Sequence, residues 1–144
     1  MFEGWVTVLH VGDCRVGRFR EGVFTWLTED HSLLAELRRT DAPHEQLAEV
    51  EMFHANVITR AVGVGESLSA DVGYHPASPG DIYLLCSDGL SRQVGVARIA
   101  EILREQSPDL PAGCSALLDA TEDAGGHDNA TVILLRLSAS SPLP

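Results

Sequence analysis

Short apolar runs separated by turn-forming residues dominate the first part of the chain. Residues 5–11, 14–20 and 23–27 are rich in β-branched and aromatic side chains, and the pairs Gly12-Asp13 and Glu21-Gly22 separate them. Runs of this composition, bounded by glycine-containing pairs, are typical of strands joined by tight turns. The pattern predicts three strands in antiparallel succession.

Two later runs are apolar throughout instead of alternating. Ile82 to Cys86 ends abruptly at Ser87-Asp88-Gly89, and residues 130–137 form the last run of the chain. For Ile82 to Cys86, a short, unbroken apolar run bounded by turn formers predicts a strand that is buried on both faces, and residues 130–137 are expected to form a last strand that is equally apolar. A carboxylate at the end of such a strand is costly to bury unless a positive group meets it, so Asp88 is the first candidate for chemistry.

Four segments carry apolar residues at helical spacing. We expect one helix to open at Thr28–His31 and to end at Arg39, and a second to follow Asp41, with Asp41 as its N-cap and Pro43 in its first turn. Two further helices are expected between Ser91 and Gly126, where Pro108 and Pro111 separate them.

The remaining segments are irregular or extended. Residues 56–62 are expected to be extended, whereas residues 66–80 are polar, contain Pro76, Pro79 and Gly80, and predict a turning loop. The tail 138–144 is small and polar and is expected to fray. Strands followed by segregated helices predict an α+β fold in a single domain.

Composition and charge narrow the class of protein. The chain has 144 residues, 44% of them hydrophobic and 22% charged, as in an ordinary globular domain. A net charge of −11, with scattered arginines and no lysine, argues against nucleic acid as a partner. No run is long enough to cross a bilayer, so no membrane partner is expected. Three separated cysteines without a CxxC pair indicate a reduced, cytoplasmic protein.

Three aspartates share one setting, at the end of an apolar run and beside Gly or Asn. They are Asp13, Asp88 and Asp128. If their strands are neighbours, three carboxylates gather at one rim of a sheet, where hard cations such as Mg²⁺ or Mn²⁺ would offset their repulsion. Asp-Gly and Asp-Asn are also ordinary turn residues. The pattern alone leaves both readings open.

Four segments strongly resemble the metal-dependent type 2C (PPM-type) serine/threonine protein phosphatases of the bacterial kind. The matching segments follow the family order: His10-Val11-Gly12-Asp13-Cys14-Arg15 with the later Leu27-Thr28-Glu29-Asp30-His31-Ser32-Leu33, then residues 56–63, 79–90 and 126–132. They cover nearly the whole chain at family-like spacings. The family pattern usually has Ser where Cys14 stands, and Asp13 beside it is retained.

The resemblance implies a β-sandwich of antiparallel strands flanked by helices, with a centre of two or three Mn²⁺ or Mg²⁺ ions that hydrolyses phosphoserine or phosphothreonine in a phosphorylated protein. It implies that Asp88 and Asp128 are metal ligands and that Asp13 helps Asp88 hold a weaker third ion. Residues from His31 to about His54 correspond to a flap that influences substrate access.

Residues 1–9 contain no counterpart of the first part of the family domain, which carries an Arg, an acidic pair and an Asp-Gly-x-Gly-Gly segment with the bridging aspartate. We therefore expect residues 1–137 to be the C-terminal portion of a PPM-type phosphatase domain. Weak metal binding, doubtful activity of the chain alone, and association through an exposed sheet edge follow as expectations. The alternatives are a non-catalytic remnant or interaction module that keeps the second half of the fold, and a plain α+β binding domain.

Other polar residues have weaker claims to chemistry. Cys86 lies in a predicted buried strand with no evident base, which favours packing over a role as nucleophile. Of the six histidines, His31 and His127 are the two that merit testing as general acids. Arg60 is expected to pair with a carboxylate near the site or to bind structurally.

Overall fold

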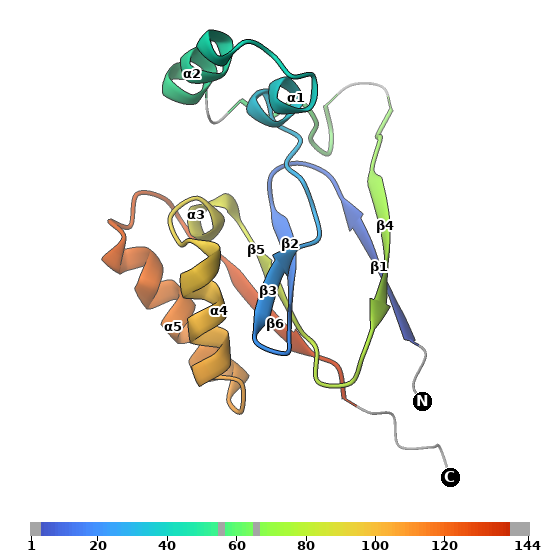
Figure 1. Cartoon of the computed structure of the whole chain (residues 1–144), viewed down its shortest axis with the longest axis vertical. Helices are drawn as coiled ribbons and strands as arrows, with labels where there is room; N and C mark the ends of the chain where they lie inside the picture. Colours follow the sequence, from blue (N-terminus) through green and yellow to red (C-terminus); the bar gives the residue numbers. More distant parts are fainter. Residues whose placement is uncertain (1–3, 55–56, 65–66, 139–144) are drawn as a thin grey trace.

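The computed structural model describes residues 4–54, 57–64 and 67–138 and forms three layers: a small sheet, a larger sheet and a pair of helices (Figure 1). No described helix is long and apolar enough to span a membrane. The elements in chain order are β1 (Gly4–His10), β2 (Arg15–Arg20), β3 (Val23–Trp26), α1 (Leu33–Arg39), α2 (His44–Phe53), β4 (Asp71–Ala77), β5 (Ile82–Cys86), α3 (Asp88–Ser91), α4 (Val96–Glu105), α5 (Leu110–Asp123) and β6 (Val132–Arg136).

The larger sheet has the order β3-β2-β5-β6, and every neighbouring pair is antiparallel. β2 and β3 form the predicted hairpin, whose turn places Glu21 and Gly22 at φ 51° and 83°. The unbroken apolar runs around residues 82–86 and 132–136 lie side by side as β5 and β6. The α+β class, with antiparallel sheets and flanking helices, is confirmed.

The smaller sheet pairs β1 with β4 and corrects two predictions. β1 does not continue into the β2–β3 hairpin, and residues 71–77 are a strand although a loop was predicted there. Pro76 has no N–H for a sheet, but an edge strand needs bonds on one side only, so β4 tolerates it opposite Trp5. The segment predicted to extend over 56–62 forms only an isolated bridge between Ser32 and Ile58 among its described residues, and Asn56 lies outside them.

The main core lies between the larger sheet and the pair α4–α5. Leu84, Ile99 and Leu117 are completely buried there. α4 places its apolar residues on one face, as the spacing predicted, and α5 is capped by Asp109, whose carboxylate accepts from the Ala112 N–H. Pro111 falls in the first turn of α5 and not before it, which suits a residue without an N–H.

The first two helices begin later than predicted and project beyond the end of the sheets (Figure 1). α1 starts at Leu33, because Ser32 is its N-cap and accepts from the Ala35 N–H. Asp41 does not cap α2: it adopts φ 49°, and Pro43 takes the N-cap position without a side-chain bond. Of the tail predicted to fray, residues 139–144 lie outside the described residues.

Candidate functional site

Asp13 and Asp88 lie together at one end of the larger sheet. The register pairs Arg15 at the start of β2 with Cys86 at the end of β5, so the residues just beyond both strands meet at the same rim. The Nη2 atom of Arg92 lies 3.1 Å from Asp13 Oδ2 and 3.4 Å from Asp88 Oδ2. The positive group expected beside Asp88 is therefore an arginine one turn later in the chain.

Asp128 stands apart in the exposed loop between α5 and β6. Its Oδ1 accepts from the Asn129 N–H at 2.7 Å, which is the local bonding of an ordinary turn aspartate. Ser87 holds the chain just after Asp128. Its N–H donates to the Thr131 carbonyl at 3.1 Å, and its Oγ accepts from the Thr131 N–H at 3.0 Å. The loop thus borders the rim that carries Asp88.

Gly89 allows the chain after β5 to lie very close to the loop between α5 and β6. A Cβ on this residue would lie 2.4 Å from the carbonyl oxygen of Asn129, a distance that no side chain tolerates. Gly89 therefore lets the short helix α3, which opens at Asp88 and was not predicted, pack directly against the loop that carries Asp128. The Asp-Gly pair serves close backbone approach here and not a turn of positive φ.

The carboxylates at the rim are the kind of ligand that a hard cation binds, but too few of them lie close together to hold one. Carboxylate oxygens are the ligands that Mg²⁺ and Mn²⁺ prefer. Within the described residues, however, no group of three or more His, Cys, Asp or Glu side chains lies close enough to hold a metal ion. The single guanidinium of Arg92 contacts both Asp13 and Asp88 and offsets one of their two negative charges. The described residues by themselves do not assemble a metal centre.

His31 organises the loop before Asp13, which the sequence did not reveal. The side chain is 1% exposed, and its Nδ1 accepts from the Gly12 N–H at 3.1 Å. The His31 N–H donates to the Gly12 carbonyl at 2.8 Å, and its own carbonyl accepts from the Thr59 N–H at 2.8 Å. His31 therefore fixes the turn at Gly12, whose φ is 101°, to the segment after α2.

The other ring nitrogen of His31 faces the smaller sheet. Nε2 lies 3.1 Å from Asp71 Oδ2, and Arg60 Nη1 donates to Asp71 Oδ1 at 2.8 Å. Arg60 and then His31 hold the pKa of the Asp71 carboxyl below its ordinary value. Because Nδ1 is an acceptor, a neutral ring carries its hydrogen on Nε2, towards Asp71. The pairing of Arg60 with a carboxylate agrees with the prediction.

His10 packs beside His31, with ring centroids 4.6 Å apart. Burial, and then the neighbouring imidazole, lower the pKa of His10. By contrast, His127 lies in an exposed loop, where its N–H faces the Gln93 Oε1 atom at 3.4 Å. Of the two histidines proposed for testing, only His31 has a buried ring, and its Nδ1 is hydrogen-bonded to the backbone.

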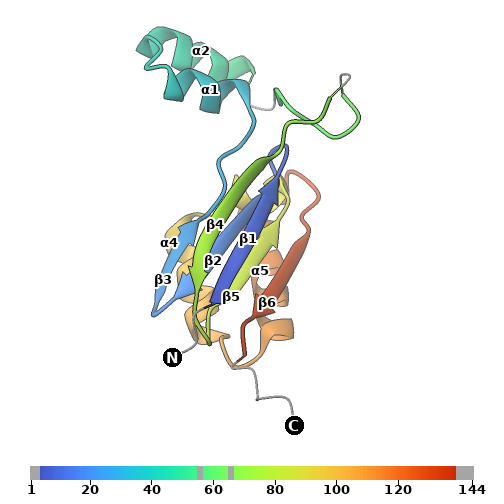
Figure 2. The same cartoon turned by 90° about the vertical axis from the view of Figure 1, so that its right-hand side faces the viewer.

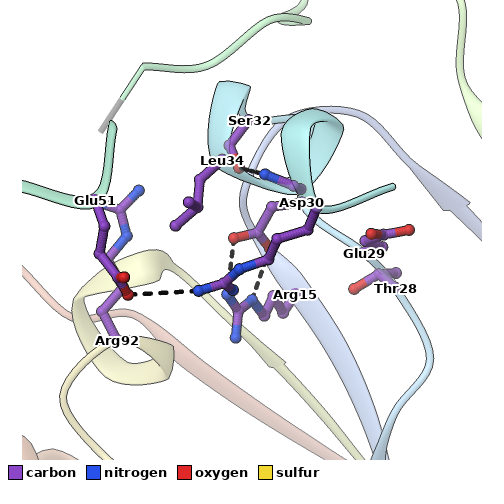
Figure 3. A pocket seen from close by; sticks show the side chains of 10 residues that line it. Arg15, Thr28, Glu29, Asp30, Ser32, Leu34, Glu51 and Arg92 are labelled. Atoms are coloured by element: carbon purple, nitrogen blue, oxygen red, sulfur yellow. Dashed lines mark hydrogen bonds and ion pairs between the residues drawn. The ribbon is translucent and has the colours of Figure 1, made fainter. Parts of the chain in front are cut away.

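A pocket of about 580 Å³ opens next to Arg92, between the rim and the first two helices (Figure 3). Arg15 forms one wall and donates to both carboxylate oxygens of Asp30 at 2.6 and 2.7 Å. Arg38 and Glu51 form another wall, and Arg38 Nη2 lies 3.4 Å from Glu51 Oε1. The segment predicted to be a flap therefore borders the same rim as Asp13 and Asp88.

The cysteines play no part at the rim. Burial raises the pKa of the Cys86 thiol to about 12, so the group stays protonated and packs in the core, as predicted. Cys14 is exposed, and burial of part of its surface followed by the charges of Asp13 and Asp88 raises the pKa of its thiol too. Neither side chain is an activated nucleophile.

Known proteins resemble the chain over nearly its whole length. The serine/threonine phosphatase stp of Listeria innocua is 36% identical over 137 residues, which are 94% of this chain and 53% of that protein. The structure of the S. agalactiae serine/threonine phosphatase matches 93% of this chain and 55% of its own, with 34% identity and a TM-score of 0.84.

A third match bears on metals. The catalytic domain of the serine threonine protein phosphatase PstP, in complex with two manganese ions, covers 96% of this chain and 56% of its own, with 30% identity and a TM-score of 0.77. No protein-family model matches the sequence. The chain spans about half the length of the relatives that it matches.

Proposed function

We propose that this chain, which is homologous to about half of a bacterial PPM-type serine/threonine phosphatase, contributes Asp13, Asp88 and Asp128 to the metal centre of such an enzyme. The proposed activity is hydrolysis of phosphoserine or phosphothreonine in a protein substrate, dependent on Mn²⁺ or Mg²⁺. One observation carries the proposal: in a chain with this similarity, Asp13 and Asp88 meet at a single rim, within reach of one cationic group.

The pocket beside Arg92 supports a role for this rim in binding substrate. Residues of the α1–α2 segment line it together with three arginines, namely Arg15, Arg38 and Arg92. Arg92 also contacts the candidate ligands Asp13 and Asp88. Each guanidinium is held by a carboxylate in this chain. The rim is therefore pre-organised and has more carboxylates than guanidinium groups. Cations at Asp13 and Asp88 would leave Arg92 available for an anionic group.

The test compares the 144-residue chain with a single-chain fusion in which the unmatched half of the Listeria innocua phosphatase precedes it. We expect the chain alone to bind Mn²⁺ weakly in calorimetry, more weakly still in Asp88→Ala, and to hydrolyse a phosphothreonine peptide no faster than Mn²⁺ in buffer. We expect the fusion to hydrolyse the peptide with Mn²⁺ and to lose at least about 100-fold in Asp88→Ala and in Asp128→Ala. Asp119→Ala, on an exposed face of α5, is the matched control.

Two results would contradict this proposal. Turnover by the chain alone that disappears in Asp88→Ala would show that these residues already complete a centre. A folded fusion that binds no Mn²⁺ would show that the rim holds no ligands.

The second candidate is a non-catalytic interaction module that keeps this half of the fold. The Arg92 bridge favours it, because a guanidinium satisfies Asp13 and Asp88 without a metal. In that case the folded fusion would show no Mn²⁺-dependent turnover, and Asp88→Ala would change neither metal binding nor catalysis.

A further inference from the structure

Asp13 and Asp88 come from segments far apart in the chain, yet their carboxylates face the same atom at the rim. Asp13 follows the turn after β1, and Asp88 opens α3 directly after β5. Their side chains are only 19% and 26% exposed. Two carboxylates in such a place repel each other, and each is costly to desolvate without a cation. A cation between them therefore stabilises the fold itself, whatever reaction the rim serves.

Arg92 supplies that cation, and the backbone places it there. The Arg92 N–H donates to the Asp88 carbonyl at 2.9 Å, one turn after Asp88, so the two side chains lie on one side of α3. The guanidinium also donates to Asp13, and this hydrogen bond joins residues that are 79 positions apart. Local helical geometry provides the first contact, and the tertiary fold provides the second.

The other two arginines of the neighbouring pocket bind other carboxylates. Arg15 donates to both oxygens of Asp30, and Arg38 pairs with Glu51. Of the three arginines that line this pocket, Arg92 is therefore the one that serves the Asp13–Asp88 pair. Its single charge offsets one of the two negative charges, whereas a divalent cation would offset both.

The guanidinium and a divalent cation would use the same oxygen atoms. The Nη2 atom of Arg92 faces Oδ2 of Asp13 and Oδ2 of Asp88. Hard divalent cations bind carboxylate oxygens directly, so such an ion has to displace the guanidinium. The pocket of about 580 Å³ that Arg92 lines gives the displaced side chain space, beside the α1–α2 segment that projects beyond the sheets (Figure 2).

We propose that Arg92 competes with divalent cations for Asp13 and Asp88. The guanidinium holds the two segments together when no metal is bound, and it weakens metal binding because the incoming ion has to break both contacts. Since the two cations exclude each other, each lowers the affinity of the pair for the other by the same factor. This inference concerns regulation of the site in the proposed function and rests on it.

The first test measures Mn²⁺ binding to the 144-residue chain by the electron paramagnetic resonance signal of the free ion. Arg92→Gln removes the competing charge, and we expect at least about 5-fold tighter binding. Arg92→Lys keeps the charge and should stay within about 2-fold of the wild type. Unchanged or weaker Mn²⁺ binding in Arg92→Gln would overturn the proposal.

Arg136→Gln is the matched control for the loss of one positive charge. β6 starts at the rim, where Val132 lies opposite Cys86, and runs away from it to the exposed Arg136, which lies opposite Ile82 (Figure 2). We expect this variant to bind Mn²⁺ within about 2-fold of the wild type. A gain equal to that of Arg92→Gln would show a general effect of net charge and would refute competition at the pair.

The second test is made in EDTA and needs no metal. Arg92→Gln should lower the melting temperature of the chain by about 3 °C or more, and Arg136→Gln by less than about 1 °C. In an Asp13→Asn background, which removes the repulsion, Arg92→Gln should cost at most half as much. Equal losses in both backgrounds would show that Arg92 does not bridge the pair.

These results separate the competition from the proposed activity. Tighter Mn²⁺ binding in Arg92→Gln, with a folded fusion that shows no turnover, would refute the activity and leave the competition standing. A fusion that turns over with Mn²⁺, while Arg92→Gln leaves Mn²⁺ affinity unchanged, would refute the competition alone.

Discussion

Replacing Asp81 by Asn tests whether the contacts of Arg20, which join the two sheets, depend on a buried ion pair. Asp81 is 1% exposed, and its carboxylate accepts four hydrogen bonds. Two come from Arg20 at 2.6 Å each, one from the Ser78 N–H at 2.9 Å and one from the Tyr83 hydroxyl at 3.2 Å. An asparagine keeps the volume but removes the charge and turns one acceptor into a donor that faces Arg20.

The expected loss of stability follows from Arg20, which the substitution leaves without its ion-pair partner. Breaking a buried ion pair by removing one partner costs about 3–5 kcal/mol. The Arg20 side chain is 29% exposed and retains some water, so we expect a loss near the lower end of that range, about 3 kcal/mol. This is a large share of the stability of an ordinary domain, which lies at about 5–15 kcal/mol.

The effect depends on pH with a defined sign. Burial raises the pKa of Asp81, but the bonds from Arg20, Ser78 and Tyr83 outweigh it and hold the pKa below its ordinary value. A carboxyl with a lowered pKa in the folded state stabilises the protein above its ordinary pKa of about 3.9, and this contribution is lost as the pH falls through the folded-state pKa. The difference between wild type and Asp81→Asn should therefore shrink in acid.

Urea unfolding followed by circular dichroism, at pH 7 and at intervals down to pH 3, measures both quantities. Glu101→Gln is the matched control, because Glu101 pairs with Arg98 at 2.6 Å on the surface and both side chains are about half exposed. We expect this control to cost less than about 1 kcal/mol. A loss below 1 kcal/mol in Asp81→Asn at pH 7, or a difference that stays constant down to pH 3, would refute the assignment.

Two further predictions concern Gly89 and the cysteines. Gly89→Ala should destabilise the chain by about 1–3 kcal/mol in the same unfolding assay and shift the amide resonances around Asn129, since its Cβ would meet that carbonyl. Gly95→Ala has open space around its Cβ and should cost less than about 1 kcal/mol, as expected for Ala in place of Gly at the N-cap of α4. Equal effects would contradict the close approach at Gly89. A thiol reagent at pH 8 should label the exposed Cys14 in the native chain. It should modify Cys86 only on unfolding, because Cys86 is buried and burial raises the pKa of its thiol to about 12. Rapid labelling of Cys86 in the native chain would contradict its burial.

Local sequence signals were sufficient for the elements whose apolar residues are continuous or recur at a regular spacing. β5, β6, α4 and the β2–β3 hairpin all follow from patterns within a single segment. β4 was missed because its evidence is not local. Its residues alternate only weakly and include Pro76, and the strand exists because β1, more than sixty residues earlier, provides its single partner.

The same distinction holds at the site. Asp13 and Asp88 were found because each follows a recognisable apolar run, and the antiparallel pairing of β2 with β5 then brings them to one rim. Arg92 and His31 could not be assigned from sequence. The bond of Arg92 to Asp13 crosses 79 residues, and that of His31 to Gly12 depends on how the loop after β3 returns to the rim.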